Sequence, residues 1–347
     1  MAMTIVESTR PVTGGVDTHL DQHVAAALDG AGALLGVESF PATAAGYRDL
    51  HSWLAGFGDV VAVGVEGTGS YGVGLARFLH RSSVKVIEVD RPNRQVRRRH
   101  GKSDPLDAVE AARAALSGRA KGLAKTADGE VEAIRVLLVA KRSARAARTK
   151  ALTQIRHLGF CAPDALRDQL RDIPVAALAG RVAALRPRPE GDVVTQSTKV
   201  ALQALGRRVL ALDAELDRLD ALLEDLVANA APQLLALHGV GPDTAASLLV
   251  AAGDNPDRLR SEAAWANLCG VAPLPASSGR TTRHRLNRGG NRQANHALWR
   301  IVITRMSSDP RTRTYVQRRL DEGLTKAEIV RVLKRYVARE IWRQLPR

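Results

Sequence analysis

The sequence has few cysteines, aromatic residues and lysines, and it has no long apolar run. Its two cysteines, Cys161 and Cys269, stand far apart, which excludes a disulfide scaffold and a Cys-rich zinc site. No apolar run reaches the ~18–20 residues that a membrane helix needs, and the N-terminus lacks the apolar core of a signal peptide. We therefore expect a cytoplasmic protein that does not enter a membrane.

Cations are abundant although lysine is scarce. Of the 51 cationic side chains only nine are Lys, and they face 36 carboxylates, which gives a formal net charge of +15. The codon usage of a GC-rich genome would explain the ratio of Arg to Lys, but not the net charge. Residues 1–90 carry ten carboxylates and five cations, so the remaining 257 residues hold a net charge of +20. An acidic beginning followed by a basic remainder indicates a polyanionic partner, most simply nucleic acid.

The length of 347 residues allows two or three domains, and the hydrophobic pattern gives the first of them an α/β character. Apolar runs with turn residues between them predict three successive strands. A helix over 43–55, a buried strand over 60–66, a helix to about residue 80 and a strand over 84–89 follow. The three early strands cover residues 14–19, 23–28 and 34–40. Such an order indicates a mixed sheet with helices against it.

The rest of the chain reads as helical. Ser103 or Asp104 is placed to cap a helix that begins with Pro105, and a second helix is expected over about 128–158. A seam of apolar residues spaced by three and four indicates a coiled coil, a long helical hairpin or a long helix packed within its own domain. Its members are Leu202, Leu205, Val209, Leu212, Leu216, Leu219, Leu223 and Leu226. Residues 234–252 look like a helix-hairpin-helix element or an ordinary helix pair joined by a glycine turn.

Four carboxylates stand where a site is expected. Asp17 and Glu66 end two apolar strands, and strand ends of an α/β sheet converge on one edge. Asp104 and Asp107 are three residues apart at a helix start, so their side chains share a face. Clustered carboxylates repel one another unless a cation neutralises them, which points to bound Mg²⁺ or Mn²⁺. Asp90 is a rival for a place in the cluster, and each acid alone is compatible with a cap or a solvated surface group.

Together these residues carry a resemblance. The segments GVDTH, VEGTGSY and KSDPLDA, followed by GVAP…SSGR…RLNRGGNRQANHALWR, resemble the DEDD transposases of the insertion-sequence 110 family over nearly the whole chain. The resemblance implies a RuvC-like domain with a ribonuclease-H-type core over 10–120. A helical, coiled-coil domain over 121–230 and a C-terminal transposase domain over 231–347 would follow. It departs from the family pattern at Pro105, where we expect a larger polar residue.

The resemblance also implies the chemistry. Asp17, Glu66, Asp104 and Asp107 would bind divalent metal, and Ser278 would attack a DNA phosphate, with Ser277 as its rival in the double-serine step. The partners implied are the element ends and target DNA, a guide RNA encoded by the element, and further copies of the chain in a dimer or tetramer joined through the coiled coil. Candidate nucleic-acid contacts are Arg94, Arg97, Arg98, Arg99, Lys102, Lys141, Arg145, Arg148, Arg280, Arg283, Arg285, Arg288 and Arg292.

Two other functions fit the same residues. The first is a metal-dependent, structure-selective DNA nuclease in which Ser278 is inert. The second is a coiled-coil protein that binds nucleic acid through its basic faces and catalyses nothing. Replacing Ser278 separates the transposase from the nuclease, and replacing Asp17 or Glu66 separates both from the binding protein.

Overall fold

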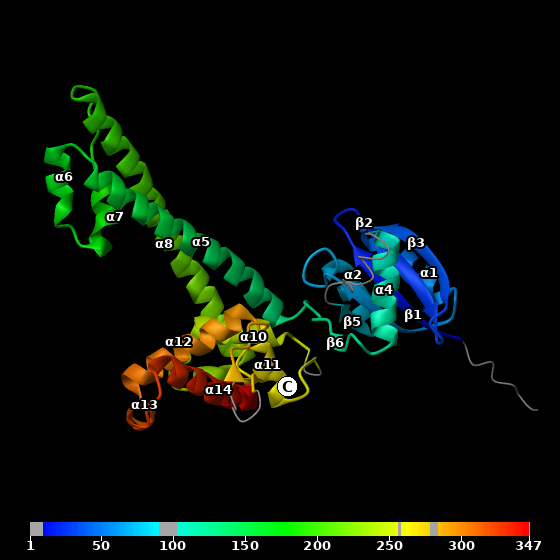
Figure 1. Ribbon diagram of the computed structural model, residues 1–347. Helices are drawn as coiled ribbons and strands as arrows, with labels where there is room; N and C mark the ends of the chain where they lie inside the picture. Colours follow the sequence, from blue (N-terminus) through cyan, green and yellow to red (C-terminus); the bar gives the residue numbers. More distant parts are fainter. Residues whose placement is uncertain (1–9, 90–102, 256–257, 278–283, 347) are drawn as a thin grey trace, which may run out of the picture. The chain divides into compact units, whose positions relative to one another are not determined.

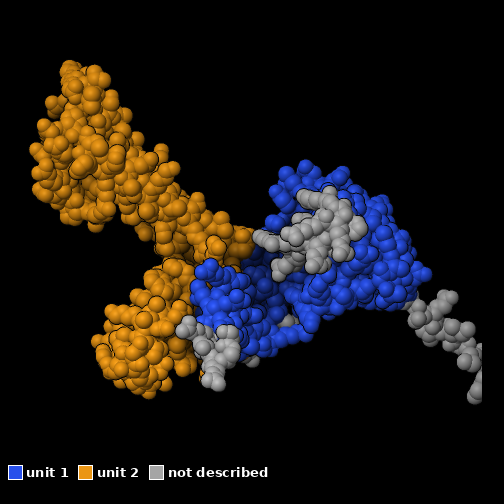
Figure 2. Space-filling view, viewed as in Figure 1, with its two compact units in different colours: residues 1–132, 251–289, 346–347 blue, residues 133–250, 290–345 orange. Residues whose placement is uncertain are grey.

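The protein is described by a computed structural model that covers residues 10–89, 103–255, 258–277 and 284–346. The chain forms two compact units, coloured separately in Figure 2. Unit 1 comprises residues 1–132, 251–289 and 346–347, and unit 2 comprises residues 133–250 and 290–345. Because residues 251–289 group with the N-terminal part, the units do not follow the three domains expected from the sequence, and that division remains a prediction.

A six-stranded mixed sheet forms the centre of unit 1 (Figure 1). Its strand order is β3-β2-β1-β4-β5-β6, with β1, β2 and β3 as an antiparallel meander and with β4 and β5 parallel to β1. The predicted α/β class and the early meander are therefore confirmed. The strands are β1 (Pro11–Thr18), β2 (Gln22–Asp29), β3 (Leu34–Pro41), β4 (Asp59–Glu66), β5 (Val86–Val89) and β6 (Gly122–Leu123).

Helices cover both faces of this sheet. On one face, α1 (Ala44–Ala55) and α2 (Val73–Arg81) bury Leu50, Leu54 and other apolar side chains against the strands. The Thr43 hydroxyl begins α1 by accepting a hydrogen bond from the Gly46 amide at 3.1 Å. The other face is covered by α4 (Asp104–Leu116), whose apolar side is almost entirely alanine.

Two glycines let α4 lie directly on the sheet. A Cβ added to Gly15 of β1 would lie 2.1 Å from the Ala112 nitrogen and 2.3 Å from the Ala108 carbonyl oxygen. A Cβ added to Gly64 of β4 would lie 2.5 Å from the Ala111 carbonyl oxygen. Glycine on the strands and alanine on the helix together permit the close approach of α4 to the sheet, because any larger side chain on either surface would push the helix outward.

Two long antiparallel helices dominate unit 2 (Figure 1). Arg148 and Lys141 of α5 (Glu130–Phe160) pair with Asp213 and Asp220 of α8 (Val193–Ala230), respectively. Near the C-terminal end of α5, α6 (Asp164–Arg171) and α7 (Val175–Ala183) share an apolar cluster with both long helices. At Gly206 of α8 an added Cβ would lie 2.6 Å from the Ala183 nitrogen, so α7 and α8 are also in backbone contact.

The predicted leucine seam lies on α8, and every member is buried or half-buried. Leu202 and Val209 pack in the cluster formed with α5, α6 and α7 of the same chain. The long helix is thus confirmed. Packing within the chain accounts for this part of the seam, and a coiled coil between chains remains a prediction.

Shorter elements complete the chain. In unit 2 they are α9 (Pro232–Leu235), α10 (Pro242–Ala252, which ends in unit 1), α12 (Arg292–Ser308), α13 (Pro310–Asp321) and α14 (Lys326–Gln344). In unit 1 they are α11 (Glu262–Leu268), β7 (Leu274–Pro275) and β8 (His284–Arg285). A turn with Gly239 at φ +78° joins α9 to α10, but α9 has only four residues, so a helix-hairpin-helix motif is not established. Of the helices described, none is long and apolar enough to cross a membrane.

Candidate active site

The carboxyl ends of two parallel strands bring Asp17 and Glu66 to one edge of the sheet. Val16 of β1 pairs with Val65 of β4, so the next residues on the two strands are neighbours. Because side chains alternate along a strand, Asp17 shares the face of Gly15 and Glu66 shares the face of Gly64. That is the face that α4 covers. This register agrees with the prediction that Asp17 and Glu66 lie at one edge of the sheet.

The first turn of α4 contributes the other two acids. Ser103 precedes the helix in an extended conformation (φ −146°, ψ 141°), and Pro105 occupies the first turn, where its missing N–H costs nothing. Asp104 and Asp107 lie in this first turn, where the helix dipole favours negative charge. Asp107 is buried, whereas the Asp104 side chain is about half exposed. Pro105 is therefore compatible with both acids at the helix start.

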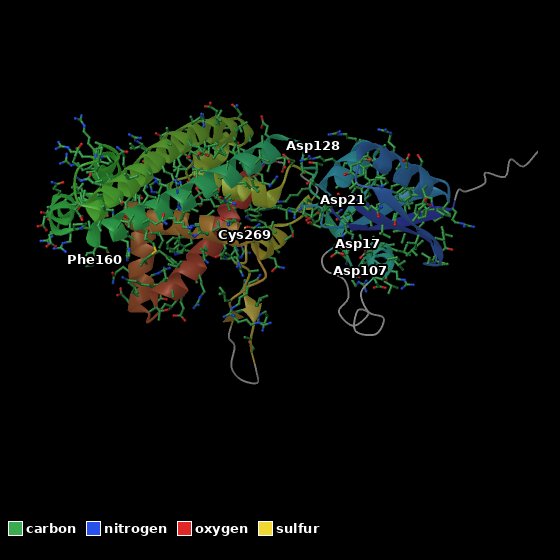
Figure 3. The ribbon with its side chains drawn as sticks, turned by 90° about the horizontal axis from the view of Figure 1, so that it is seen from above. Asp17, Asp21, Asp107, Asp128, Phe160 and Cys269 are labelled. Carbon is green, nitrogen blue, oxygen red and sulfur yellow. The ribbon has the colours of Figure 1, made fainter. Side chains whose placement is uncertain are left out.

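His19 joins the two carboxylate pairs and was not identified from the sequence. Its Nε2 lies 3.2 Å from Asp17 Oδ2 and 3.4 Å from Asp104 Oδ1. One potential ligand atom from each of these three residues lies within 4.8 Å of the others. The signal in the sequence was the Asp-x-His spacing of Asp17 and His19 at the end of an apolar strand. Figure 3 labels Asp17 and Asp107 at this edge.

The surroundings of Asp17 favour its uncharged form. Burial raises the pKa of Asp17, the nearby Asp107 and Asp104 carboxylates raise it further, and His19 acts in the opposite direction. The balance leaves the pKa of Asp17 above its ordinary value. A buried carboxylate with a raised pKa beside two other carboxylates is an arrangement that a divalent cation would stabilise.

Two threonines hold the backbone around Glu66. The Thr18 hydroxyl donates to the Glu66 carbonyl oxygen at 2.8 Å, which ties the end of β4 to the end of β1. Two residues after Glu66, the buried Thr68 hydroxyl donates to Glu88 Oε1 at 3.0 Å. The Glu66 side chain is half-buried. Asp90, the rival fifth acid, falls outside the described residues.

The predicted serine nucleophile lies in the segment between β7 and β8. These strands pair antiparallel through Leu274 with Arg285 and Pro275 with His284, so residues 276–283 connect them. Ser277 is exposed, while Ser278 falls outside the described residues. The structure therefore gives no geometry between Ser278 and the four acids.

The predicted nucleic-acid contacts divide into three groups. Arg285, Arg288 and Arg292 are exposed. Arg94, Arg97, Arg98, Arg99, Lys102, Arg280 and Arg283 fall outside the described residues. The third group, on α5, is already paired with carboxylates.

The three α5 cations are paired with carboxylates of the same chain, and one of them is buried. Lys141 is 5% exposed and pairs with Asp220 and Asp243. Arg145 and Arg148 are more exposed, but they pair with Asp243 and Asp213. The role of these three cations as nucleic-acid contacts remains a prediction, and Lys141 is the one of the three whose side chain is buried. Their carboxylate partners are 65 to 102 residues away in the chain, so spacing along α5 could not reveal them.

Comparison with known proteins decides the family. Residues 14–158 match the family model described as "Transposase" and specific to DEDD enzymes of IS110, and residues 231–317 match the one described as "Transposase IS116/IS110/IS902 family". The first match spans all four predicted acids, and the second spans the predicted serine. The chain belongs to the IS110 family of transposases.

Three relatives of the IS110-family chain illustrate how far the likeness extends. The 43.6 kDa protein of insertion element IS110 from Streptomyces coelicolor is 36% identical over 146 residues, and the 42 kDa protein of IS900 from Mycobacterium paratuberculosis is 29% identical over 211. These alignments span 34% and 51% of the relatives' lengths, and 42% and 54% of this chain. The mini-circle protein of IS117 from S. coelicolor is 27% identical, over 91% of this chain and 89% of its own length.

Proposed function

We propose that this IS110-family chain cuts and rejoins DNA to move an insertion sequence. The observation that supports it is the grouping of Asp17, His19 and Asp104 within 4.8 Å, with buried Asp107 acting on Asp17 from the same helix turn. The end of β1, the turn that follows it and the start of α4 supply these groups, so elements far apart in the chain build the arrangement. Four acids and a histidine at one sheet edge suit phosphoryl transfer.

The donor set fits Mg²⁺ or Mn²⁺. Carboxylate oxygens are the ligands that both ions prefer. Burial and the neighbouring Asp107 and Asp104 carboxylates raise the pKa of Asp17, and a bound divalent cation would offset that cost. We propose Asp17, Glu66, Asp104 and Asp107 as ligands, with His19 as a further ligand or as the group that orients Asp17 and Asp104. When bound, such ions neutralise charge that develops on a phosphate in displacement and lower the pKa of an attacking hydroxyl.

The attacking hydroxyl in this proposal is that of Ser278. Its oxygen forms a bond to a DNA phosphorus, and the bond from that phosphorus to a deoxyribose oxygen breaks. The serine hydroxyl loses its proton, and the departing deoxyribose oxygen takes up a proton to become a hydroxyl. The covalent serine–phosphate link preserves the phosphodiester energy, so a second DNA hydroxyl can displace the serine without hydrolysis. Ser277, the exposed neighbour, is the alternative nucleophile.

The partners are part of the proposal. Element ends, target DNA and a structured guide RNA are polyanions, and exposed Arg285, Arg288 and Arg292 are available to contact phosphates. Lys141 is left out of this set because its ammonium group is buried between two carboxylates. We further propose that copies of the chain assemble, so that the serine of one subunit reaches the acids of another.

A matched pair of serine variants tests the nucleophile. With Mg²⁺ and element DNA, the wild type should form a protein–DNA adduct that survives denaturing electrophoresis, and Ser278→Ala should abolish both the adduct and strand exchange. Ser277→Ala should retain both. If Ser277→Ala alone loses the adduct, the nucleophile is Ser277.

The same assay separates the alternatives. DNA cleavage that persists in both serine variants, without an adduct, would replace the transposase with a metal-dependent nuclease. DNA binding that is unaccompanied by any cleavage, in the wild type and in Asp17→Ala alike, would leave only a nucleic-acid-binding protein.

A further inference from the structure

A second group of charges in unit 1 joins residues 251–258 to the sheet and takes no part in the chemistry above. It contains Glu88 of β5, Lys125 from the segment after β6, Glu132 from the first turn of α5, and Asp254 and Arg258 from the segment after α10. These residues are up to 170 positions apart in the chain, and all belong to unit 1, the blue unit of Figure 2.

Arg258 links the end of α10 to the sheet. Its Nη1 donates to the carbonyl oxygens of Ala252 and Ala251 at 3.0 and 3.3 Å, which caps the last turn of the helix. Its Nη2 lies 3.8 Å from Glu88 Oε2. The Arg258 side chain is only 14% exposed, whereas that of Glu88 is 37% exposed, so the cation is the more shielded partner of this ion pair.

Glu88 also contacts the turn that follows Glu66. While Oε2 faces Arg258, Oε1 accepts the hydrogen bond from the buried Thr68 hydroxyl. The intervening Gly67 has φ +67°, a conformation that favours glycine and turns the chain sharply after β4. A continuous series of contacts therefore runs from Arg258 through Glu88 and Thr68 to within two residues of a proposed metal ligand.

Other contacts fix the same segment independently. Asp254 Oδ1 accepts from the Val131 amide at 3.0 Å, and Asn255 Nδ2 donates to the Ala124 carbonyl oxygen at 2.9 Å. Burial lowers the pKa of Lys125 and the neighbouring Arg258 lowers it further, against the attraction of Glu88, Asp254 and Glu132. Lys125 and Arg258 therefore both lie close to Glu88.

We propose that Arg258 is a positioning residue for Glu66, acting through Glu88 and Thr68. Through these contacts Arg258, which lies in the segment after α10, would raise the affinity of the acidic site of the same chain for divalent metal. The physical reason is that Glu66 sits on a strand end held by Thr18 on one side and by Thr68 on the other, and Thr68 depends on a carboxylate that Arg258 orients. The inference rests on the proposed metal site.

The inference is tested by measuring Mn²⁺ binding to the full chain without DNA. Titration calorimetry and the electron paramagnetic resonance signal of free Mn²⁺ give the affinity. Arg258→Ala and Thr68→Val should each weaken binding, by about tenfold, as is typical when a group behind a metal ligand is lost. Because the two residues act through one series of contacts, their effects should not add. The double variant should bind Mn²⁺ about as tightly as whichever single variant has the lower affinity. Arg258→Lys should recover part of the affinity.

Arg305→Ala is the matched control. Arg305 is similarly shielded, pairs with Glu340 at 2.6 Å and donates to the His238 carbonyl oxygen, but it lies in unit 2. Its loss should leave Mn²⁺ affinity unchanged. Glu88→Gln keeps an acceptor for Thr68 and leaves the α10 cap intact, so it should weaken binding in the same direction by a smaller factor.

Additive losses in the double variant, or wild-type affinity in Arg258→Ala and Thr68→Val, would overturn the positioning role. A separate result bears on the metal site itself. If Asp17→Asn binds Mn²⁺ as tightly as the wild type, the proposed site is wrong whatever the Arg258 variants do.

Discussion

Asp17 is a carboxylate whose surroundings favour its protonated form. Its raised native pKa means that the folded state holds the proton more tightly than the unfolded state does. The resulting stability is fully present below the ordinary pKa of 3.8 and is lost as the pH rises through the native value. Without metal, Asp17→Asn should therefore melt a few degrees higher than the wild type at pH 7, and this difference should shrink on acidification.

Calorimetry with and without Mn²⁺ checks this prediction. Mn²⁺ should raise the melting temperature of the wild type, because a ligand that binds only the folded state stabilises it, and it should not raise that of Asp17→Asn. The variant should also lose strand cleavage. Equal melting temperatures for the metal-free proteins at pH 7 would contradict the electrostatic account of the site.

The sequence was informative about single residues only where local pattern sets their position. Asp17 and Glu66 could be placed together because each ends an apolar strand, and Asp104 and Asp107 because three residues separate them on a helix. His19 was missed because its contact with Asp104 spans 85 residues of chain, and the hidden partners of Lys141 were missed for the same reason. Distant pairing is a property of the fold, not of local spacing.

Among the elements, α4 depends most on small residues beneath it. Gly15→Ala would place a Cβ 2.1 Å from the Ala112 backbone, so the helix that carries Asp104 and Asp107 must move away from the strand that carries Asp17. Overpacking of this kind costs about 1–3 kcal/mol or more. Denaturant unfolding should show the loss, and Mn²⁺ binding should weaken with it.

Gly69→Ala is the control for this substitution. A Cβ at Gly69 would meet nothing within 4 Å, so its free energy of unfolding should stay within about 0.5 kcal/mol of the wild type. A fully tolerated Gly15→Ala would mean that α4 does not rest on the sheet as closely as described.

The contact of α5 with α8 and α10 depends on Lys141. Burial pushes the pKa of Asp243 upward, but the Lys141 hydrogen bond and the charges of Lys141, Arg145 and Arg300 outweigh it and leave the pKa lowered. Lys141→Met would leave Asp220 and Asp243 without their shared cation. We expect a loss of roughly 2–4 kcal/mol at pH 7, below the upper range for buried pairs because Asp220 is half exposed.

Urea unfolding at two pH values measures this loss. A lowered native pKa stabilises the fold above pH 3.8, and that contribution disappears as the pH falls through the native value, so wild type and variant should converge in acid. Arg142→Ala, an exposed neighbour on α5, should change stability by less than about 0.5 kcal/mol. Equal stability of Lys141→Met and wild type would show that the ion pairs contribute nothing net.

The elements themselves were largely predictable. Strand and helix positions in residues 10–116 follow the apolar pattern within a few residues, most clearly for β1 and β2, which are almost entirely buried. The seam of α8 predicted the helix but not what packs on it. Leu202 and Val209 are buried by α5, α6 and α7 of the same chain, and the apolar spacing alone does not distinguish this packing from packing against a second chain. The grouping of residues 251–258 with the sheet had no signal in the sequence, because single polar contacts such as Asn255 with Ala124 create it.

At the scale of the whole molecule, charge is divided along the chain. Residues 1–90 hold a net −5, which includes two of the proposed metal ligands, and the other 257 residues hold +20. Because the acids would repel a DNA phosphate, metal has to neutralise them before a phosphate can approach. If the chain binds DNA as proposed, exposed cations of the basic remainder such as Arg288 and Arg292 would hold the polyanion, rather than the paired cations of α5.

This division predicts a steep dependence of binding on salt. If six or more phosphates are contacted, affinity for element DNA or guide RNA should fall by ~10³-fold or more between about 50 mM and about 200 mM salt, because bound counterions are released on association. Fluorescence anisotropy at a series of salt concentrations gives the slope. Arg288→Ala and Arg292→Ala should each reduce it by about one, whereas Lys141→Met, already paired in the free protein, should leave the slope unchanged. Binding that does not respond to salt would mean that the +20 of the basic remainder is not what holds the nucleic acid.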